Sequence, residues 1–221
     1  MVSLERPWPE VEAGGRRLYG GSQMLSTDAV LRRCGCGPVA ALDTLRYLQN
    51  DSAVMPLADY DRALKALCPR YFPLIPPFGI NGLVFVLGLN RLLRDRGLPC
   101  RAVWMVSGRK LWTRVEEQLR HDLPVILSVG SNFPLVWENN RLPLYRRLPD
   151  GSFRKAAATK GHFVTATGLD DTWLRVSSWG REYYINRKEY EHYTKEHSNY
   201  VFGNMIGLKK RKMVTIQSCL S

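Results

Sequence analysis

The sequence has no hydrophobic run long enough to cross a membrane. Its longest unbroken apolar stretches, such as residues 83–87, fall far short of the roughly 18 residues that a membrane-spanning helix needs. The N-terminal residues include Glu5, Arg6, Pro7 and Pro9 and lack the apolar segment of a signal peptide. We therefore expect a protein without a membrane span that stays in the cytoplasm.

Acidic residues are scarce relative to basic ones. The chain has 20 Asp and Glu against 32 Lys and Arg, which gives a formal net charge of +12. Such a balance favours an acidic partner, whether a peptide, an anionic lipid or a nucleic acid. No nucleic-acid-binding motif accompanies it, so nucleic acid is the less favoured partner. The basic run 209–212 predicts an exposed edge strand whose lysines block edge-to-edge pairing, with an anion-binding patch as the alternative.

The sequence contains only five cysteines and four histidines. An odd number of scattered cysteines without a signal peptide argues against a disulfide framework. No second Cys or His pair stands at a zinc-like distance from the Cys34-Gly35-Cys36 step. We therefore expect neither a metal nor a cofactor.

The order of predicted elements indicates an α+β protein of one domain, 1–221. We expect an irregular segment over 1–22, a mainly helical half over 23–98 and a mainly β half over 99–221. Apolar spacing predicts helices over 36–49, 57–67 and 81–96 and, in the second half, over 110–120 and 187–194. Short apolar or alternating runs predict strands over 100–106, 124–129, 162–167 and 173–178, with further edges near 183–185 and 200–206. Because helices precede a mostly antiparallel sheet, the order is not that of a doubly wound fold.

Cys36 occupies a chemically favourable position at the start of the predicted helix 36–49. The N–H groups of a helix N-terminus stabilise a thiolate, and Pro38 is typical of a first helical turn. The alternative is that Cys36 is a small buried apolar residue. Cys34 also precedes a glycine, but its place after Arg33 puts it in the expected loop, where it could act as a resolving thiol for Cys36.

A nucleophilic thiol needs a base, and His162 is the best candidate. It follows Gly161 and opens a predicted apolar strand. His121 is placed as a helix C-terminal cap, whereas His192 and His197 lie among charged residues of a polar helix. The competing interpretation of His162 is a strand-end histidine without a catalytic task.

Three segments, 36–41, 161–171 and 176–180, together resemble the papain-like cysteine peptidases. The sequences Cys-Gly-Pro-Val-Ala-Ala, Gly-His followed by apolar residues to Gly-Leu-Asp-Asp, and Ser-Ser-Trp-Gly carry the resemblance. It is closest to bacterial peptidases that resemble the double-glycine leader peptidases of bacteriocin exporters. The resemblance implies a papain-like fold and hydrolysis of a peptide, isopeptide or other amide bond through a thioester, or acyl transfer by the same intermediate.

The resemblance also implies roles for individual residues. Cys36 would be the nucleophile, held as a thiolate beside the imidazolium of His162. Gln23 and the backbone N–H of Cys36 would form the oxyanion hole. Trp179 would cover the histidine contact. Ser177 stands where the family has the Asn or Asp that orients the histidine.

The serine at that third position leaves three alternatives. Ser177 suffices as the orienting group, or Asp170, Asp171 or Asn186 reaches the histidine instead. The third is a degenerate site in a papain-fold module that binds an acidic partner without cutting it. In the catalytic case, Arg32 and Arg33 predict an electropositive mouth that lowers the pKa of the thiol and favours an acidic peptide or protein substrate.

Overall fold

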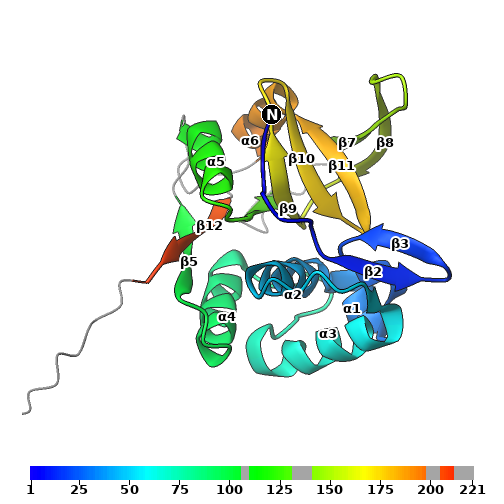
Figure 1. The fold of residues 1–221 in the computed structure, drawn as a ribbon, viewed down its shortest axis with the longest axis vertical. Helices are drawn as coiled ribbons and strands as arrows, with labels where there is room; N and C mark the ends of the chain where they lie inside the picture. The colour runs from blue at the N-terminus through cyan, green and yellow to red at the C-terminus, as the bar shows by residue number, and fades with distance from the viewer. Residues whose placement is uncertain (106–109, 131–140, 198–204, 212–221) are drawn as a thin grey trace, which may run out of the picture.

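The computed structural model describes residues 1–105, 110–130, 141–197 and 205–211. Helices α2 (Cys36–Leu48), α3 (Leu57–Tyr71) and α4 (Gly82–Asp95) lie on one side of a large sheet, and helices α5 (Leu111–Arg120) and α6 (Arg187–His197) lie on its other side (Figure 1). The pairings of that sheet are antiparallel. This arrangement confirms the predicted α+β class, with a helical half packed on an antiparallel sheet.

The predicted helices of the first half are present with small shifts at their ends. The helices are α1 (Ala29–Cys34), α2 (Cys36–Leu48), α3 (Leu57–Tyr71), α4 (Gly82–Asp95), α5 (Leu111–Arg120) and α6 (Arg187–His197), preceded by the 3₁₀ turn η1 (Gln23–Leu25). Helix α1 was not expected, because the segment before Cys36 was predicted as a loop. Its N-terminus is capped by Asp28, whose carboxylate accepts from the N–H of Leu31 at 2.8 Å.

The sheet does not follow the order of the chain. From one edge to the other its strands are β5 (Cys100–Met105), β12 (Met205–Lys210), β6 (Val125–Val129), β9 (His162–Leu169), β10 (Trp173–Ser178), β11 (Arg181–Asn186), β7 (Leu142–Arg147) and β8 (Phe153–Thr159). A smaller sheet has the order β3 (Arg16–Tyr19), β2 (Glu10–Ala13) and β4 (Met55–Pro56). Strand β9, which begins at His162, therefore lies in the interior of the large sheet.

The prediction of an irregular N-terminal segment over 1–22 is wrong. Strand β1 (Val2–Ser3) pairs with the end of β9, and β2 and β3 form a hairpin. Gly14 and Gly15 connect the hairpin with φ values of 57° and 73°, as a two-residue type I′ turn requires. The Gly-Gly pair was the sequence signal for this turn.

The prediction that the basic run forms an edge strand is also wrong. Strand β12 lies between β5 and β6, and its lysines Lys209 and Lys210 pair with Arg101 and Cys100 of β5. Strand β12 inserts there because its apolar residues Ile206 and Leu208 belong to the core. Arg211 follows β12 and donates its N–H to the oxygen of Pro99 at 2.9 Å, and Lys212 lies outside the described residues.

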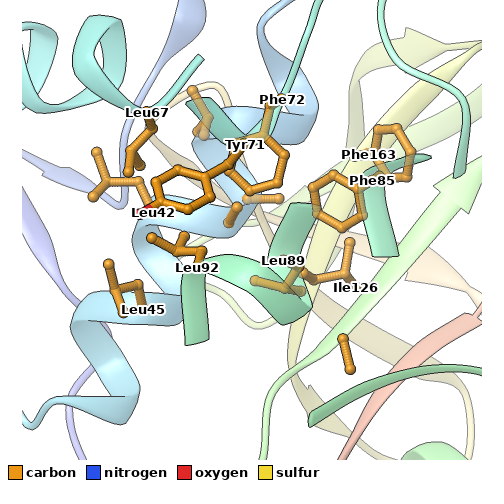
Figure 2. Packing of buried hydrophobic residues seen from close by; sticks show 14 of the residues in the cluster. Leu42, Leu45, Leu67, Tyr71, Phe72, Phe85, Leu89, Leu92, Ile126 and Phe163 are labelled. Carbon is orange, nitrogen blue, oxygen red and sulfur yellow. The ribbon is translucent and has the colours of Figure 1, made fainter. Parts of the chain in front are cut away.

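The predicted helix over 36–49 is present as α2, and it is buried on all sides. Every residue over 37–47 is buried, including two charged ones. The helix contacts β9, α3 and α4, and Figure 2 shows Leu42 and Leu45 of α2 within the packed side chains. The rings of Phe85 and Phe163 stack there with centroids 4.9 Å apart, and this contact joins α4 to the start of strand β9. The N-terminus of α2 is thus fixed against the strand that begins at His162.

Candidate active site

Cys36 is the first residue of α2 and lies in the wall of a large cavity. The cavity has a volume of about 1320 Å³, and its wall includes Cys36, His162, Gln23 and Trp179. Gly37 allows the close approach that this geometry needs, since a Cβ there would lie 2.9 Å from Cγ2 of Ile80. The fold thus brings into one cavity four residues that are far apart in the sequence.

Burial dominates the electrostatics of the Cys36 thiol. Desolvation raises the pKa of Cys36, although the backbone N–H groups of Phe163, Gly37 and Cys36 itself act in the opposite direction. The N–H of Phe163 comes from the residue after His162, which places the sulfur beside the start of β9. The expected lowering of the thiol pKa is therefore not found, because the cost of burying a thiolate exceeds the gain from these N–H groups.

His162 is buried and held by a hydroxyl and an aromatic ring. Its Nε2 lies 2.8 Å from Oγ of Ser178, and its ring stacks on Trp179 with centroids 4.5 Å apart. Burial lowers the pKa of His162 to about 3. Since burial raises the pKa of Cys36, both shifts favour a neutral thiol and a neutral imidazole over the expected thiolate–imidazolium pair.

The hydroxyl on the histidine belongs to Ser178 and not to Ser177, which was the predicted partner. Ser177 pairs with Thr165 across the sheet. Side chains alternate between the two faces along a strand, so Thr165, three residues after His162, projects from the opposite face. Ser177, as its cross-strand partner, projects from that face too. Its hydroxyl instead donates to the backbone oxygen of Tyr19 at 2.9 Å.

The other candidates for the third position make local contacts. Asp170 accepts hydrogen bonds from the backbone N–H groups of Thr172 and Trp173 in the turn after β9. Asn186 accepts from the N–H groups of Lys188 and Glu189 at the start of α6. Asp171 follows Asp170 in the same turn and is exposed. None of these three side chains lines the cavity that contains His162.

Trp179 has an unusual backbone conformation. It and Gly180 connect β10 to β11, with φ values of 49° and 70°, so that both are left-handed, as in a type I′ turn. A left-handed residue with a Cβ costs about 1–2 kcal/mol, and tryptophan is rare there. The stack on His162 and an edge contact with Tyr183 hold the ring in place.

Gln23 lies in η1 and is buried at the cavity wall. Its Nε2 donates to the backbone oxygen of Arg32 at 3.4 Å, a long contact that uses one of the two amide protons.

The segment before Cys36 is not the expected loop, because it forms η1 and α1, which pack on each other. Cys34 is the last residue of α1, not a loop residue, and its thiol is directed at the backbone oxygen of Pro77 at 3.6 Å.

Two buried carboxylates that sequence reasoning missed support this segment. Asp61 of α3 accepts from Oγ of Ser26 at 2.5 Å and from Oγ1 of Thr27 at 2.6 Å, directly after η1. Burial alone would raise the pKa of Asp61, but these hydrogen bonds and Lys65 hold it well below its usual range. The segment between η1 and α1 is thereby tied to α3.

Asp43 holds the residues that precede η1. It lies on α2, is 2% exposed, and accepts from the N–H of Gly21 at 2.9 Å and from the hydroxyl of Tyr60 at 2.8 Å. Burial raises the pKa of Asp43 to about 6. The helix that begins with Cys36 therefore also anchors the chain that leads to Gln23.

Arg32 and Arg33 are exposed in the last turn of α1 and line the cavity. A guanidinium nitrogen of Arg32 donates to the backbone oxygen of Ser26 at 2.7 Å. The predicted positive charge at the mouth is present. Its predicted effect on Cys36 is not, because burial raises the pKa of this thiol.

Among the described residues there is no group of three or more His, Cys, Asp or Glu side chains that could hold a metal ion. The same part of the chain contains no helix that is long and apolar enough to span a membrane.

Comparisons with known proteins find one distant structural similarity. No protein-family model and no curated protein matches the sequence. A crystal structure from Bacillus anthracis, named as a C39-like peptidase, is similar with a TM-score of 0.48. It is 12% identical, and the alignment covers 87% of this chain and 95% of that chain. A similarity this distant does not assign the chain to a family.

Proposed function

We propose that this protein is a papain-like cysteine hydrolase that cleaves an amide bond of a peptide or protein through a thioester. The observation that carries the proposal is the convergence of Cys36, at a helix N-terminus, and His162, at a strand start, on one cavity. The imidazole is fixed there by Ser178 and Trp179. Structural cysteines and histidines do not require this combination of a helix terminus, an oriented ring and a large opening.

The hydrogen bond to Ser178 is compatible with the tautomer that a general base needs. When Nε2 donates its proton to Oγ of Ser178, Nδ1 is the unprotonated nitrogen. Nδ1 has no hydrogen-bond partner among the residues that the structure describes. It would accept the proton of Cys36, and Ser178 would stabilise the imidazolium that forms.

The proposed reaction has two steps, formation of the thioester and its hydrolysis. The S–H proton of Cys36 passes to Nδ1 of His162 as sulfur attacks the carbonyl carbon. The backbone N–H of Cys36 and the second amide proton of Gln23 would stabilise the resulting oxyanion. The C–N bond breaks as the imidazolium protonates the leaving amine. His162 then deprotonates a water that attacks the thioester, and the thiol is restored.

Because burial favours the neutral pair, proton transfer would accompany attack on the bound substrate and not precede it. The same observation favours the second candidate, a papain-fold module that binds a peptide without cleaving it. The two differ in whether the thiol reacts.

The experiment that tests the proposal combines a peptide library with active-site labelling. We expect the wild-type protein to release amines from a mixed peptide library, as detected by mass spectrometry, and to lose this activity in Cys36→Ala and in His162→Ala. A peptide chloromethyl ketone, which alkylates a thiolate with release of chloride, should label Cys36 but not Cys68, a partly buried thiol on α3 that serves as the internal control. Labelling of Cys36 that is unaffected by His162→Ala would support the binding module instead.

A further inference from the structure

The cavity around Cys36 is lined by charge of one sign. Its charged lining residues are Arg16, Arg32, Arg33, Lys160 and Arg181, and no Asp or Glu among the described residues lines it. Outside the cavity some arginines pair with carboxylates, whereas others, such as Arg146 and Arg154, form no ion pair with a described residue. Ion pairs join Arg6 to Asp122, Arg17 to Glu10, Arg46 to Asp51, Arg62 to Asp59, Arg70 to Asp95 and Arg120 to Glu116. What distinguishes the cavity is that its lining combines several cations with no carboxylate of a described residue.

Three of these cations are exposed and available for a ligand. Arg16, Arg33 and Arg181 form no ion pair with any described residue. Arg181 follows Trp179 and Gly180 directly, and the N–H of Tyr19 donates to the oxygen of Gly180 at 3.0 Å. This bond places β3, which begins with Arg16, beside β11, which begins with Arg181. Arg181 thus directly follows the turn that holds the covering ring, and Arg16 lies three residues before Tyr19 on the neighbouring strand, in the wall of the same cavity.

The same cavity also exposes large apolar side chains. Ile75 is 67% exposed, Phe78 64% and Met24 58%, and all three line the cavity. Ile75 and Phe78 belong to the loop that contacts Cys34 through the oxygen of Pro77. Exposed apolar residues gathered around one opening are typical of a binding site.

We infer that the substrate is an acidic peptide that also carries bulky apolar side chains, and that Arg16 and Arg181 determine this specificity. The inference rests on the proposed function and names the substrate class of that site. Carboxylates bind guanidinium groups through two parallel hydrogen bonds, and Ile75 and Phe78 receive the apolar residues. The exposed apolar surface favours a peptide over a nucleic acid, whose backbone offers no comparable side chains.

Binding to the inactive protein tests the inference without requiring turnover. The full-length Cys36→Ala protein is titrated, by fluorescence anisotropy, into labelled peptides that share their Leu and Phe residues but carry either Glu or Gln at the remaining positions. We expect at least tenfold tighter binding of the Glu peptide, and loss of that preference in about 0.5 M salt, because salt screens exposed charges. The double variant Arg16→Gln/Arg181→Gln should remove the preference, and Phe78→Ser should weaken both peptides.

A matched control separates a local site from overall charge. Arg146 and Arg154 pair across β7 and β8, are both exposed and do not line the cavity. Arg146→Gln/Arg154→Gln lowers the net charge by the same amount, and we expect the Glu-peptide affinity to stay within twofold. A loss equal to that of the cavity variant would show that only the total charge matters and would overturn the inference.

The outcomes distinguish the inference from the proposed function. Equal affinity for both peptides overturns the acidic specificity, even if the active protein cleaves them. Selective binding that Arg16→Gln/Arg181→Gln abolishes supports the inference, even if the active protein cleaves neither peptide and the proposed function fails. A single-stranded DNA oligonucleotide that displaces the Glu peptide at lower concentration than the unlabelled peptide overturns the assignment of a peptide.

Discussion

Ser178, and not the neighbouring Ser177 that the sequence predicted, is the residue whose hydroxyl contacts the imidazole of His162. The hydroxyl of Ser178 lies 2.8 Å from Nε2 of the histidine, whereas Ser177 donates to the oxygen of Tyr19 on the other face of the sheet. Two adjacent residues of one strand thus have separate tasks, one at the imidazole and one at the N-terminal hairpin.

Variants of the two serines should separate these tasks. Ser178→Ala removes the partner that fixes the imidazole, and we expect kcat/KM to fall about 10- to 100-fold, as misplaced catalytic groups commonly cause. Ser178→Asn, which restores an acceptor, should recover part of that loss. Steady-state cleavage of a peptide found in the library screen provides the measurement.

Ser177→Ala is the matched control for Ser178→Ala. It removes one hydroxyl from the same strand, and we expect a loss of about 1 kcal/mol in the free energy of unfolding with little change in kcat. A larger fall in kcat for Ser177→Ala than for Ser178→Ala would show that the hydrogen bond to Nε2 does not serve catalysis.

The ring of Trp179 shields the imidazole, so its removal should change how His162 titrates. In Trp179→Ala, water reaches the ring and the pKa of His162 should rise from about 3 towards its ordinary value near 6.5. The chemical shift of the His162 Cε1 proton, followed by NMR between pH 3 and 8, measures the change. Trp173→Ala, at the opposite end of β10 from Trp179, should leave this titration unaltered.

The sequence indicated those parts of the candidate site that depend on local signals. Cys36 was recognisable from the glycines and Pro38 that surround a helix start, and His162 from its place before an apolar strand. Both patterns act over a few residues, and the structure places both side chains in the same cavity. The helix boundaries of α2 and α4 follow from spacing in the same way.

The serine assignment failed because of a β-bulge between two strands. Arg175 pairs with Gly168, but the next residue, Val176, pairs with Ala166, so β9 contains one extra residue. Without the bulge, Ser177 would lie opposite Ala166 and share a face with His162. A register shift of one residue moves the side chains that follow it to the other face of the sheet. No residue in either strand indicates where the bulge occurs.

The two supporting carboxylates were missed for a different reason. Asp43 and Asp61 lie on helices, where acidic side chains are usually solvated. Their partners, such as Gly21 and Ser26, belong to distant segments. Only the tertiary fold shows that these helices are covered on the side of the carboxylates.

The hairpin of β7 and β8 was not predicted either, because its outer half is basic and has no alternation of apolar and polar residues.

The buried carboxyl of Asp43 should make the protein less stable as pH rises. Its folded pKa of about 6 lies above the ordinary value of 3.8, so the folded state binds the proton more tightly. Its contribution is fully present below pH 3.8 and is lost as pH rises through 6, by at most about 3 kcal/mol. Asp43→Asn removes this dependence, so the variant should gain stability relative to wild type between pH 5 and 7.5 in urea unfolding.

His162 should affect stability in the opposite direction. Its folded pKa of about 3 lies below the ordinary 6.5, so the unfolded state binds the proton more tightly. Its contribution is fully present above pH 6.5 and decreases as pH falls towards 3. His162→Gln removes this loss, and the advantage of wild type over the variant should shrink by about 2–3 kcal/mol between pH 7.5 and 4.5. A pH-independent difference would mean that the imidazole is solvated.

Gln23 provides the sharpest test of the oxyanion hole. Its amide donates one proton to the oxygen of Arg32, and the proposed mechanism uses the other. Gln23→Ala should lower kcat about 100-fold or more with little change in KM, because the oxyanion exists only in the transition state and the intermediate. The contact with Arg32 is long at 3.4 Å, so the free energy of unfolding should fall by no more than about 1 kcal/mol.

Gln49→Ala is the control for Gln23→Ala. Gln49 is exposed at the other end of α2, and its removal deletes the same side chain without touching the cavity. We expect wild-type kcat and KM from this variant. If Gln23→Ala raises KM and leaves kcat within threefold, the amide contributes to substrate binding alone, and the backbone N–H of Cys36 must stabilise the oxyanion with another donor.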